Sequence, residues 1–303
     1  MSAFIEARNE DFGVEFICRT LGVSASAYYR RATGQRSARA VEDERLLVVI
    51  RAVHEDNYEA YGARRMWKAL GRAGEDVGRD HVRRLMREHG IQGAKRRGRP
   101  WRTTTPDQGS QRRPDLVKRQ FVAVAPNRCW VADFTYIRCW AGTVFFSFVL
   151  DVFSRMIVGW QFATHMRTSL VLDALQMAVA ERAPKVRGLL IHHSDAGSQY
   201  TSGDFDVALV EHGLLGSIGS VGDAYDNAMA ESLVDSFKTE LIADRVWRTH
   251  SQVELAIVRW VGWYNGRRLH ESLGDVPPIE YEHHWALSQL PVATEPHGLP
   301  APV

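Results

Sequence analysis

The stretch "CWVADFTYIRCWAGTVFFSFVLDVFSRMIVGWQFAT", residues 129–164, decides the fold, because it alternates in the manner of β-strands. Residues 129–140 form one such run, and Ala141-Gly142 supplies a two-residue turn of the hairpin type. Residues 143–155 and 156–164 follow as two more runs rich in β-branched and aromatic residues. The stretch therefore predicts a meander of three strands.

Helical and strand patterns alternate after this meander. The pattern predicts a helix over 169–182 that ends before Pro184, a fourth strand in "GLLIHHSD" (188–195) and a helix in "DFDVALVEHG" (204–213). A fifth strand in "LLGSIGS" (214–220), a helix in "GDAYDNAMAESLVDSFKTEL" (222–241) and a long helix over 251–265 complete the series. We expect an α/β fold, in which helices pack on a mixed five-stranded sheet.

The first ninety residues indicate a separate, all-α region. "VEFICRTLGVSASAYYRR" (14–31) predicts a helix ending near Leu21-Gly22 and a second helix with Ser24 as its N-cap, which is a helix-turn-helix pattern. "YGARRMWKALGRAGEDVGRDHVRRLMREHGI" (61–91) repeats the arrangement, with Met66, Trp67 and Leu70 inward on one helix and Val82, Leu85 and Met86 inward on the next. Its second helix presents Arg79, Arg83, Arg84 and Arg87 outward, as a helix in a DNA major groove does. A helical bundle with a solvated basic face is the alternative.

Charge is distributed unevenly along the 303 residues, although the net charge is only +2. Residues 91–120 contain nine basic residues, including Lys95, Arg96, Arg97 and Arg99, and only two acidic ones. A basic segment that contacts a phosphate backbone and a merely solvated linker both fit this composition. We expect helices over 1–93, a basic linker over 94–122, an α/β core over 123–285 and a tail over 286–303.

Several classes of protein are disfavoured by the same sequence. The longest apolar run, residues 143–150, is too short to cross a bilayer, and the N-terminus lacks the features of a signal peptide. The three cysteines show no CxxC spacing, so neither a disulfide framework nor a cysteine-rich zinc site is indicated. The expected location is the cytoplasm.

Three acids stand out by their positions. Asp133 lies in mid-strand, where an unpaired buried carboxylate is costly, and Asp195 ends the fourth strand, at the edge where open α/β sheets place their ligands. On a helical wheel, Glu231 shares a polar line with Asn227 and Lys238 along the margin of the apolar face, so we expect it to be half-buried. Each of Asp133 and Asp195 could instead be a structural acid.

The three carboxylates converge if this helix packs near the first and fourth strands. Such a cluster is costly unless a cation is present, and oxygen ligands suit Mg²⁺ or Mn²⁺. Two such ions would activate an attacking hydroxyl and stabilise the leaving oxygen of a phosphodiester. His192 and His193 are the alternative ligands, although packing and orienting roles suit them better.

Three blocks, "WVADFTYI", "HHSDAGSQY" and "YDNAMAESLVDSFKTEL", resemble those of the Asp-Asp-Glu transposase and retroviral integrase superfamily, whose core is ribonuclease H-like. Thirty-five residues separate Asp195 from Glu231, a spacing typical of that group, and Lys238 follows Glu231 by seven. Residues 4–282, including "WYNGRRLHESLGDVPP", more narrowly resemble the second-reading-frame (OrfB) protein of the insertion sequence 3 family.

The resemblance implies a transposase that frees a 3′-hydroxyl at an element end and joins it to target DNA. Asp133, Asp195 and Glu231 would be its catalytic, metal-binding residues, with two Mg²⁺ or Mn²⁺ ions, and Lys238 and Asn227 would contact DNA. Implied partners are double-stranded DNA (terminal inverted repeats and target), the upstream-frame transposase protein and further copies of the chain, at the bacterial nucleoid and without a membrane.

Two other functions remain open on the sequence alone. One is a catalytically silent, transposon-derived DNA-binding protein, although such a protein has no need for three mutually repelling acids. The other is a ribonuclease H-like nuclease that cleaves RNA-DNA hybrids without strand transfer. Trp260, Trp263 and Tyr264 are expected in the core, whereas Arg267, Arg268 and His270 could touch DNA.

Overall fold

The computed structural model describes residues 1–34, 36–95, 113–183, 188–219, 227–243 and 245–290. The chain divides into two compact units. A helical unit comprises residues 1–56 and 66–92, and a sheet unit comprises residues 57–65 and 93–303. None of the described helices is long and apolar enough to span a membrane.

The helical unit begins with α1 (Ser2–Phe12), α2 (Val14–Thr20) and α3 (Ala25–Ala32). The helix-turn-helix pattern expected over 14–31 is confirmed, because the Ser24 hydroxyl accepts a hydrogen bond from the Ala27 N–H and caps α3. A small cluster of buried side chains, Ile5, Val14, Ile17 and Cys18, holds these helices together.

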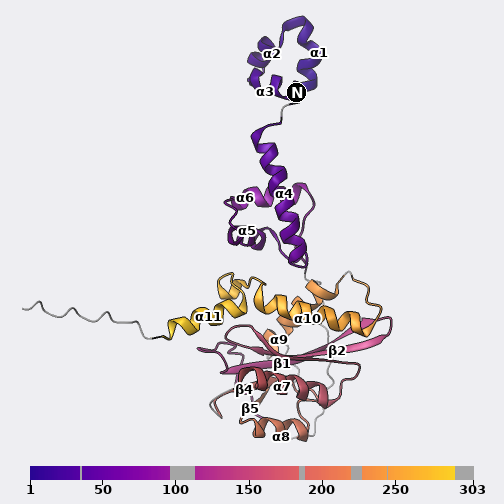
Figure 1. Cartoon of the computed structure of the whole chain (residues 1–303), viewed down its shortest axis with the longest axis vertical. Helices are drawn as coiled ribbons and strands as arrows, with labels where there is room; N and C mark the ends of the chain where they lie inside the picture. Colours follow the sequence, from indigo (N-terminus) through magenta and orange to yellow (C-terminus); the bar gives the residue numbers. More distant parts are fainter. Residues whose placement is uncertain (35, 96–112, 184–187, 220–226, 244, 291–303) are drawn as a thin grey trace, which may run out of the picture. The chain divides into compact units, whose positions relative to one another are not determined.

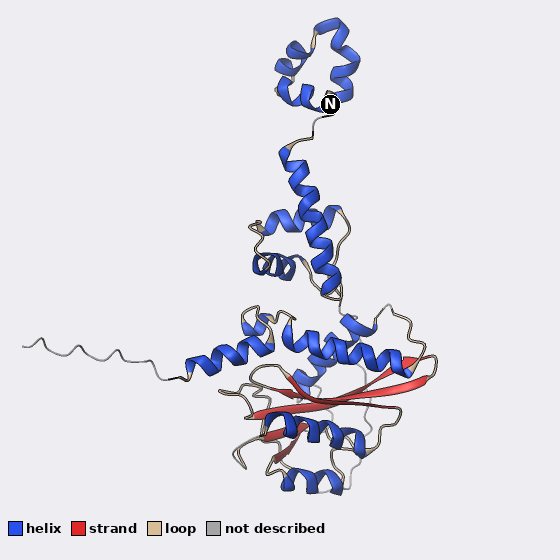
Figure 2. Ribbon diagram, in the orientation of Figure 1, coloured by secondary structure: helices blue, strands red, loops and turns tan. Residues whose placement is uncertain are grey.

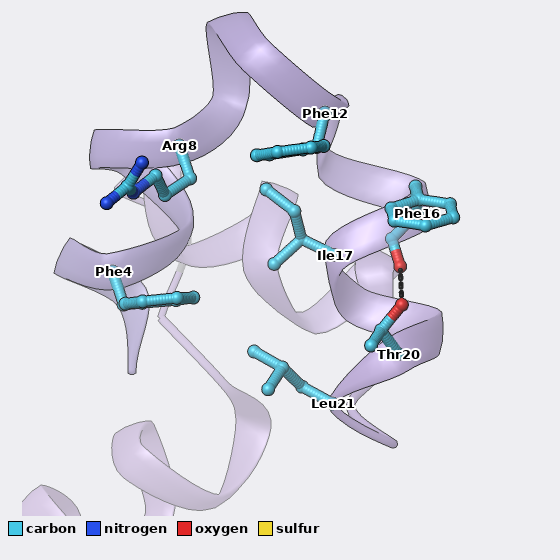
Figure 3. Close-up of a pocket in the computed structure, with 7 residues that line it drawn as sticks. All are labelled: Phe4, Arg8, Phe12, Phe16, Ile17, Thr20 and Leu21. Atoms are coloured by element: carbon cyan, nitrogen blue, oxygen red, sulfur yellow. Dashed lines mark hydrogen bonds between the residues drawn. The ribbon is translucent and has the colours of Figure 1, made fainter.

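A cavity of about 340 Å³ lies between α1 and α2 and has mainly apolar walls (Figure 3). Its lining residues are Phe4, Arg8, Phe12, Phe16, Ile17, Thr20 and Leu21. Phe4, Phe12 and Phe16 each remain more than half exposed, at 56%, 58% and 51%. The core of this part is therefore too small to cover its own aromatic side chains.

The second half of the helical unit contains α4 (Ala38–Asp56), α5 (Ala63–Arg72) and α6 (Arg79–Glu88). The inward side chains are the predicted ones. Met66 and Leu70 are buried on α5, as are Val82, Leu85 and Met86 on α6. Trp67 is half-buried and donates its indole N–H to the Val77 carbonyl at 2.9 Å.

The sheet unit is built on five strands: β1 (Cys129–Cys139), β2 (Gly142–Asp151), β3 (Ile157–Ala163), β4 (Ile191–Ser194) and β5 (Leu215–Ile218). Their order is β3-β2-β1-β4-β5, with an antiparallel β1-β2-β3 meander and with β4 and β5 parallel to β1. The hairpin turn is one residue earlier than predicted, at Trp140-Ala141, because Cys139 pairs with Gly142.

Helices cover both faces of the sheet (Figures 1 and 2). On one face lie α7 (Thr168–Arg182) and α8 (Gly203–Glu211), which share a core with Trp130 and Ala132 of β1. α7 approaches β3 so closely that a Cβ at Gly159 would overlap Ala174 and Ala178. On the other face lie α9 (Ala228–Phe237), α10 (His250–Gly266) and α11 (Pro278–Ser288).

Two details of the sheet unit differ from the sequence expectation. α11 continues to Ser288, where weak periodicity had predicted a tail from residue 286, and Pro278 begins it with the φ angle that suits a first helical turn. At the other end, the Leu116 N–H bonds to the Ser217 hydroxyl at 2.9 Å and Val117 is buried. The edge strand β5 is therefore covered by residues upstream of position 123. The expected architecture, a mixed five-stranded sheet with helices after an all-α region, is confirmed.

Candidate active site

The candidate site lies where β1 and β4 part. The two strands pair only from Cys129↔Ile191 to Ala132↔Ser194. Asp133 is the next residue of β1 and Asp195 the next residue after β4, so the parallel register brings them to neighbouring positions. Beyond this point the β1 edge that faced β4 continues to Cys139 with no partner strand among the described residues. The sheet thus places two acids side by side at its carboxyl edge.

Asp133 is held in an unfavourable electrostatic position. Its Oδ1 accepts the N–H of Phe134 at 2.7 Å. Burial and the neighbouring charge of Asp195 raise the pKa of Asp133 well above its ordinary value, and Glu231 adds to the effect. The Phe134 N–H and Lys238 act in the opposite direction without cancelling it. Without a cation, the ionised form of Asp133 is therefore electrostatically disfavoured.

Asp195 opens a tight turn beneath which a tyrosine is buried. The Asp195 Oδ1 accepts the Gly197 N–H at 3.1 Å. Tyr200 is 1% exposed, and burial followed by the charges of Asp133 and Asp195 raises its pKa well above the ordinary value. Tyr200 is a site residue that the sequence analysis missed, although an aromatic residue five positions after Asp195 was a usable signal.

Glu231 is exposed rather than half-buried, which corrects the expectation from the helical wheel. It lies in the first turn of α9, where no earlier helical turn covers it. What burial remains raises the pKa of Glu231, and the charge of Asp235 adds to this. Asn227 is buried and donates its side-chain N–H to the Ala132 carbonyl at 3.2 Å. It therefore connects the start of α9 to β1, next to Asp133, instead of facing outward.

Asp195 and Glu231 both act on the charge of Asp133, but the three acids do not close around a point. No group of three or more His, Cys, Asp or Glu side chains within the described ranges is close enough to hold a metal ion. The donors themselves suit a hard cation, since all three are carboxylates and Asp133 carries an unrelieved charge penalty. The donor set fits Mg²⁺ in kind, while Glu231 stands apart on the exposed turn of α9.

Lys238 follows α9 at the start of a π-helical turn, η2 (Lys238–Ile242), where the wheel had assumed a regular α-helix. Its ammonium lies 5.1 Å from the ring centre of Tyr136 on β1. Burial lowers the pKa of Lys238, and the charges of Asp133 and Asp235 oppose the effect. The lysine is thus at the same edge of β1 as the acids, and Tyr136 is a second residue that sequence analysis missed.

The basic residues of the helical unit separate into two groups. Arg79, Arg83 and Arg87 on α6 are exposed, as expected. Arg84 is not outward: it donates two hydrogen bonds to Asp43 on α4, at 2.7 and 2.8 Å, and one to Glu88 at 2.8 Å. Lys95 is exposed, while Arg96, Arg97 and Arg99 lie outside the described residues.

The histidines before Asp195 pack within the fold, as the preferred interpretation had them. His192 is buried, with ring centres 5.3 Å from Phe205 and 6.3 Å from Tyr200. His193 is bonded through Nδ1 to the Ser217 hydroxyl at 2.9 Å.

In the late motif, Trp260, Trp263 and Tyr264 are in the core as expected. Arg268 and His270 are also buried, so neither lies where it could touch DNA, whereas Arg267 is exposed. The side chain of Arg268 pairs with Glu240, a partner that the sequence analysis did not consider.

Family models match most of the sheet unit and part of the helical unit. Two models described as "Integrase core domain" match residues 123–224 and 212–278, and one described as "HTH-like domain" matches residues 41–99. By structure, the chain is similar to the catalytic core domain of BIV integrase, with a TM-score of 0.41 and 17% identity over 54% of this chain and 98% of that one.

Relatives by sequence cover most of the chain. A Mycobacterium tuberculosis (strain H37Ra) protein named for the insertion sequence element IS986/IS6110 is 45% identical over 89% of this chain and 99% of its own length. The Shigella sonnei transposase for insertion sequence element IS629 is 44% identical over 93% and 95%. With an integrase core, a helix-turn-helix-like domain and full-length relatives of this kind, the chain belongs to the transposases of insertion sequences, of the insertion sequence 3 family type.

Proposed function

We propose that this transposase cuts and joins DNA by Asp-Asp-Glu chemistry at the parting of β1 and β4. The observation that supports the proposal is that Asp133 and Asp195 are adjacent in the parallel register, where burial, followed by the charges of Asp195 and Glu231, raises the pKa of Asp133. A structural acid would have its charge matched by neighbouring donors. Acids that repel one another at a sheet edge instead indicate a site for a cation and a substrate.

Asp133, Asp195 and Glu231 are the residues that would hold Mg²⁺ or Mn²⁺. Two such ions, when bound, supply an activated hydroxyl and charge stabilisation at the leaving oxygen of a phosphodiester. Asp133 lies on β1 and Asp195 directly follows β4, and the backbone N–H groups of Phe134 and Gly197 bond to their carboxylates, so they define the rigid side of the site. Glu231 is carried by α9, so closing the site on a substrate requires this helix turn to approach β1.

DNA would be bound by residues of both units. Lys238, beside Tyr136 and Asp133, is suited to a phosphate next to the scissile bond. Arg79, Arg83 and Arg87 form an exposed basic face on α6 that suits a duplex, and Lys95 begins the basic segment. Joining two element ends to a target further implies an assembly of several copies, with the upstream-frame protein as an additional partner.

The test is cleavage of a duplex that carries the terminal inverted repeat of the element, in the presence of Mg²⁺. We expect a nick that frees a 3′-hydroxyl, followed by joining of this end to a second duplex. Glu231→Gln should reduce both steps by at least about a thousandfold, because it removes one charged ligand while keeping the shape of the side chain. Glu254→Gln is the matched control and should leave both steps unchanged, since it makes the same change at an exposed glutamate of α10.

Three outcomes would contradict the proposal. Cleavage that is unchanged in Glu231→Gln removes this residue from the site. Specific binding of the repeat with no cleavage by the wild-type protein supports the catalytically silent DNA-binding protein. Cleavage of RNA-DNA hybrids without strand transfer supports a ribonuclease H-like nuclease.

A further inference from the structure

A buried ion pair connects the motif "WYNGRRLHESLGDVPP" to the helix that carries Glu231 and Lys238. The Arg268 Nε donates to both carboxylate oxygens of Glu240, at 3.0 Å each, and one Nη donates to the same carboxylate at 2.6 Å. Arg268 is 5% exposed and Glu240 6%. Buried pairs of this kind contribute little net stability, because both charges must be desolvated, so stability alone does not account for this pair.

The position of this pair supplies a reason. The same Nη of Arg268 also donates to the Ser236 hydroxyl at 3.3 Å. Ser236 lies in the last turn of α9 and Glu240 lies in η2, so Arg268 bonds to residues two positions before and two positions after Lys238. Residues two apart on a helix point in different directions, and Lys238 is therefore presented away from the guanidinium.

The segment between Ser236 and Glu240 is also where the helix changes geometry. The Ala243 N–H donates to the Lys238 carbonyl at 2.7 Å, which is the five-residue closure of a π-turn. Such turns are rare and occur frequently at functional sites. Phe237 fixes the inner side by stacking on Phe146 with ring centres 4.7 Å apart. A wide turn of this kind needs contacts on more than one side to keep a single conformation.

Arg268 itself is held in place by its own surroundings. Its guanidinium lies 5.3 Å from the ring centre of Tyr264, and its other Nη lies 3.3 Å from the His270 Nδ1. Burial and the adjacent guanidinium lower the pKa of His270 well below its ordinary value, so the ring stays neutral and can accept this hydrogen bond. The motif thus forms a rigid support beneath η2.

We propose that Arg268 is a positioning residue for DNA recognition. By bonding to Ser236 and Glu240 on both sides of Lys238, it holds the Lys238 ammonium at the open edge of β1, between Tyr136 and Asp133, where a DNA phosphate binds. The inference rests on the proposed function for the role of Lys238 at the site. It assigns to the late motif an indirect role, through the helix, instead of a direct contact with DNA.

The experiment removes the pair without leaving a buried charge. The double variant Glu240→Leu/Arg268→Met keeps the volume of both side chains, and its folding is checked by circular dichroism and thermal unfolding. The matched control is Arg182→Met/Glu282→Leu, which removes a second largely buried bidentate pair of the same unit, bonded at 2.6 and 2.7 Å between α7 and α11. Binding of the duplex that carries the terminal repeat is then measured against salt concentration.

Each phosphate contact contributes about 0.9 to the slope of log affinity against log salt. We expect Lys238→Ala and the Glu240/Arg268 double variant each to lower the slope by about this amount, and the triple variant to lower it no further. The single variant Arg268→Lys keeps the charge but not the bidentate geometry, so it should lower the salt slope less than the Glu240/Arg268 double variant does. The Arg182/Glu282 control should keep the wild-type slope.

Two results would overturn the inference. One is a folded Glu240/Arg268 double variant with the wild-type slope and wild-type 3′-end cleavage. The other is a full additional loss from Lys238→Ala in that background, which shows that the two act independently. Failure of the proposed function is distinguishable, because it appears as absent cleavage by the wild-type protein, while the salt slopes still report on whether Arg268 acts through Lys238.

Discussion

Asp133 and Glu240 are acids of the same unit, and their surroundings are opposite. Glu240 is paired with a guanidinium through three hydrogen bonds. Asp133 has the acids Asp195 and Glu231 as neighbours, and its pKa is raised by burial and by both of them. A matched charge identifies a scaffold element, whereas acids that repel one another identify a place where a missing positive charge is to be bound.

The largest effect is expected from removing the partner of the paired acid, Glu240. Arg268→Met leaves the Glu240 carboxylate buried without its partner, and we expect a loss of about 3–5 kcal/mol in the free energy of unfolding. Adding Glu240→Leu should recover most of this loss. Urea unfolding followed by circular dichroism measures both. Equal stability of the single and double variants would show that the pair is less buried than the structure has it.

The opposite change, a gain in stability, is expected when the charge of Asp133 is removed. Because its pKa is raised in the folded state, ionisation of Asp133 disfavours folding above that pKa, and the penalty is relieved as the pH falls from the folded pKa toward the ordinary pKa of an unfolded aspartate. Asp133→Asn should therefore raise the melting temperature of the metal-free protein while abolishing cleavage. Saturating Mg²⁺, at about 100 times its dissociation constant, should stabilise the wild-type protein by about 2.7 kcal/mol and the variant far less.

Thermal unfolding with and without Mg²⁺ checks this comparison, and Asp151→Asn is its control. Asp151 is also a buried acid, with a pKa raised by burial, but its carboxylate accepts hydrogen bonds from the backbone N–H groups of Asn127, Phe153 and Ser154. Its replacement should destabilise the protein with or without Mg²⁺. A stabilised Asp151→Asn would mean that burial alone, and not the acidic neighbours, sets the behaviour of Asp133.

The sequence predicted the elements of this fold because each is specified locally. Alternation in residues 129–164 produced the meander, and Ser24 in the capping position produced the start of α3. The two aspartates could be placed at one edge, since each follows from where a strand runs or ends. Their adjacency needs only the order of β1 and β4, which a crossover connection favours.

What the sequence could not supply depends on contacts between distant segments. The partner of Glu240 comes 28 residues later, and no local pattern connects the two. The π-turn at Lys238 adjoins this contact and the stacking of Phe237 on Phe146, and a wheel of constant pitch could not show it. Arg84 looked like its neighbours on α6 because its partner, Asp43, lies on another helix. Arg84 and Arg268 were both expected where DNA could reach them, and each is instead paired with an acid from a distant segment.

His192 is a third case, a buried titratable group with neither a partner nor a substrate. Both ring nitrogens are buried without a hydrogen bond in the described structure, and burial, with Arg113 and His193, lowers the pKa of His192 to about 3. Above the unfolded-state pKa of about 6.5 the ring is neutral in both states, so His192 costs the folded protein nothing. As the pH falls from there toward 3, the free energy of unfolding decreases, because only the unfolded chain can protonate the ring.

His192→Phe keeps the ring between Tyr200 and Phe205 and removes the titration. We expect the variant to match the wild-type protein at pH 7.5 and to exceed its free energy of unfolding by about 1.4 kcal/mol at pH 5.5. Urea unfolding at the two pH values measures the difference. A gap that does not change with pH would show that His192 is hydrogen-bonded when folded.

The smallest expected effect compares a matched and an unmatched charge on α6. Arg84 is bonded to Asp43, whereas Arg83 is exposed. If this helix contacts DNA through its exposed face, Arg83→Ala should lower the salt slope of duplex binding by about 0.9 and leave the melting temperature unchanged. Arg84→Ala should lower the melting temperature and leave the salt slope unchanged, because Asp43 loses the donor that lowers its pKa. If Arg84→Ala abolished DNA binding and Arg83→Ala did not, the Arg84–Asp43 pair would be needed to orient α6 on DNA. Paired and exposed charges in this unit could then not be assigned separately to stability and to DNA binding.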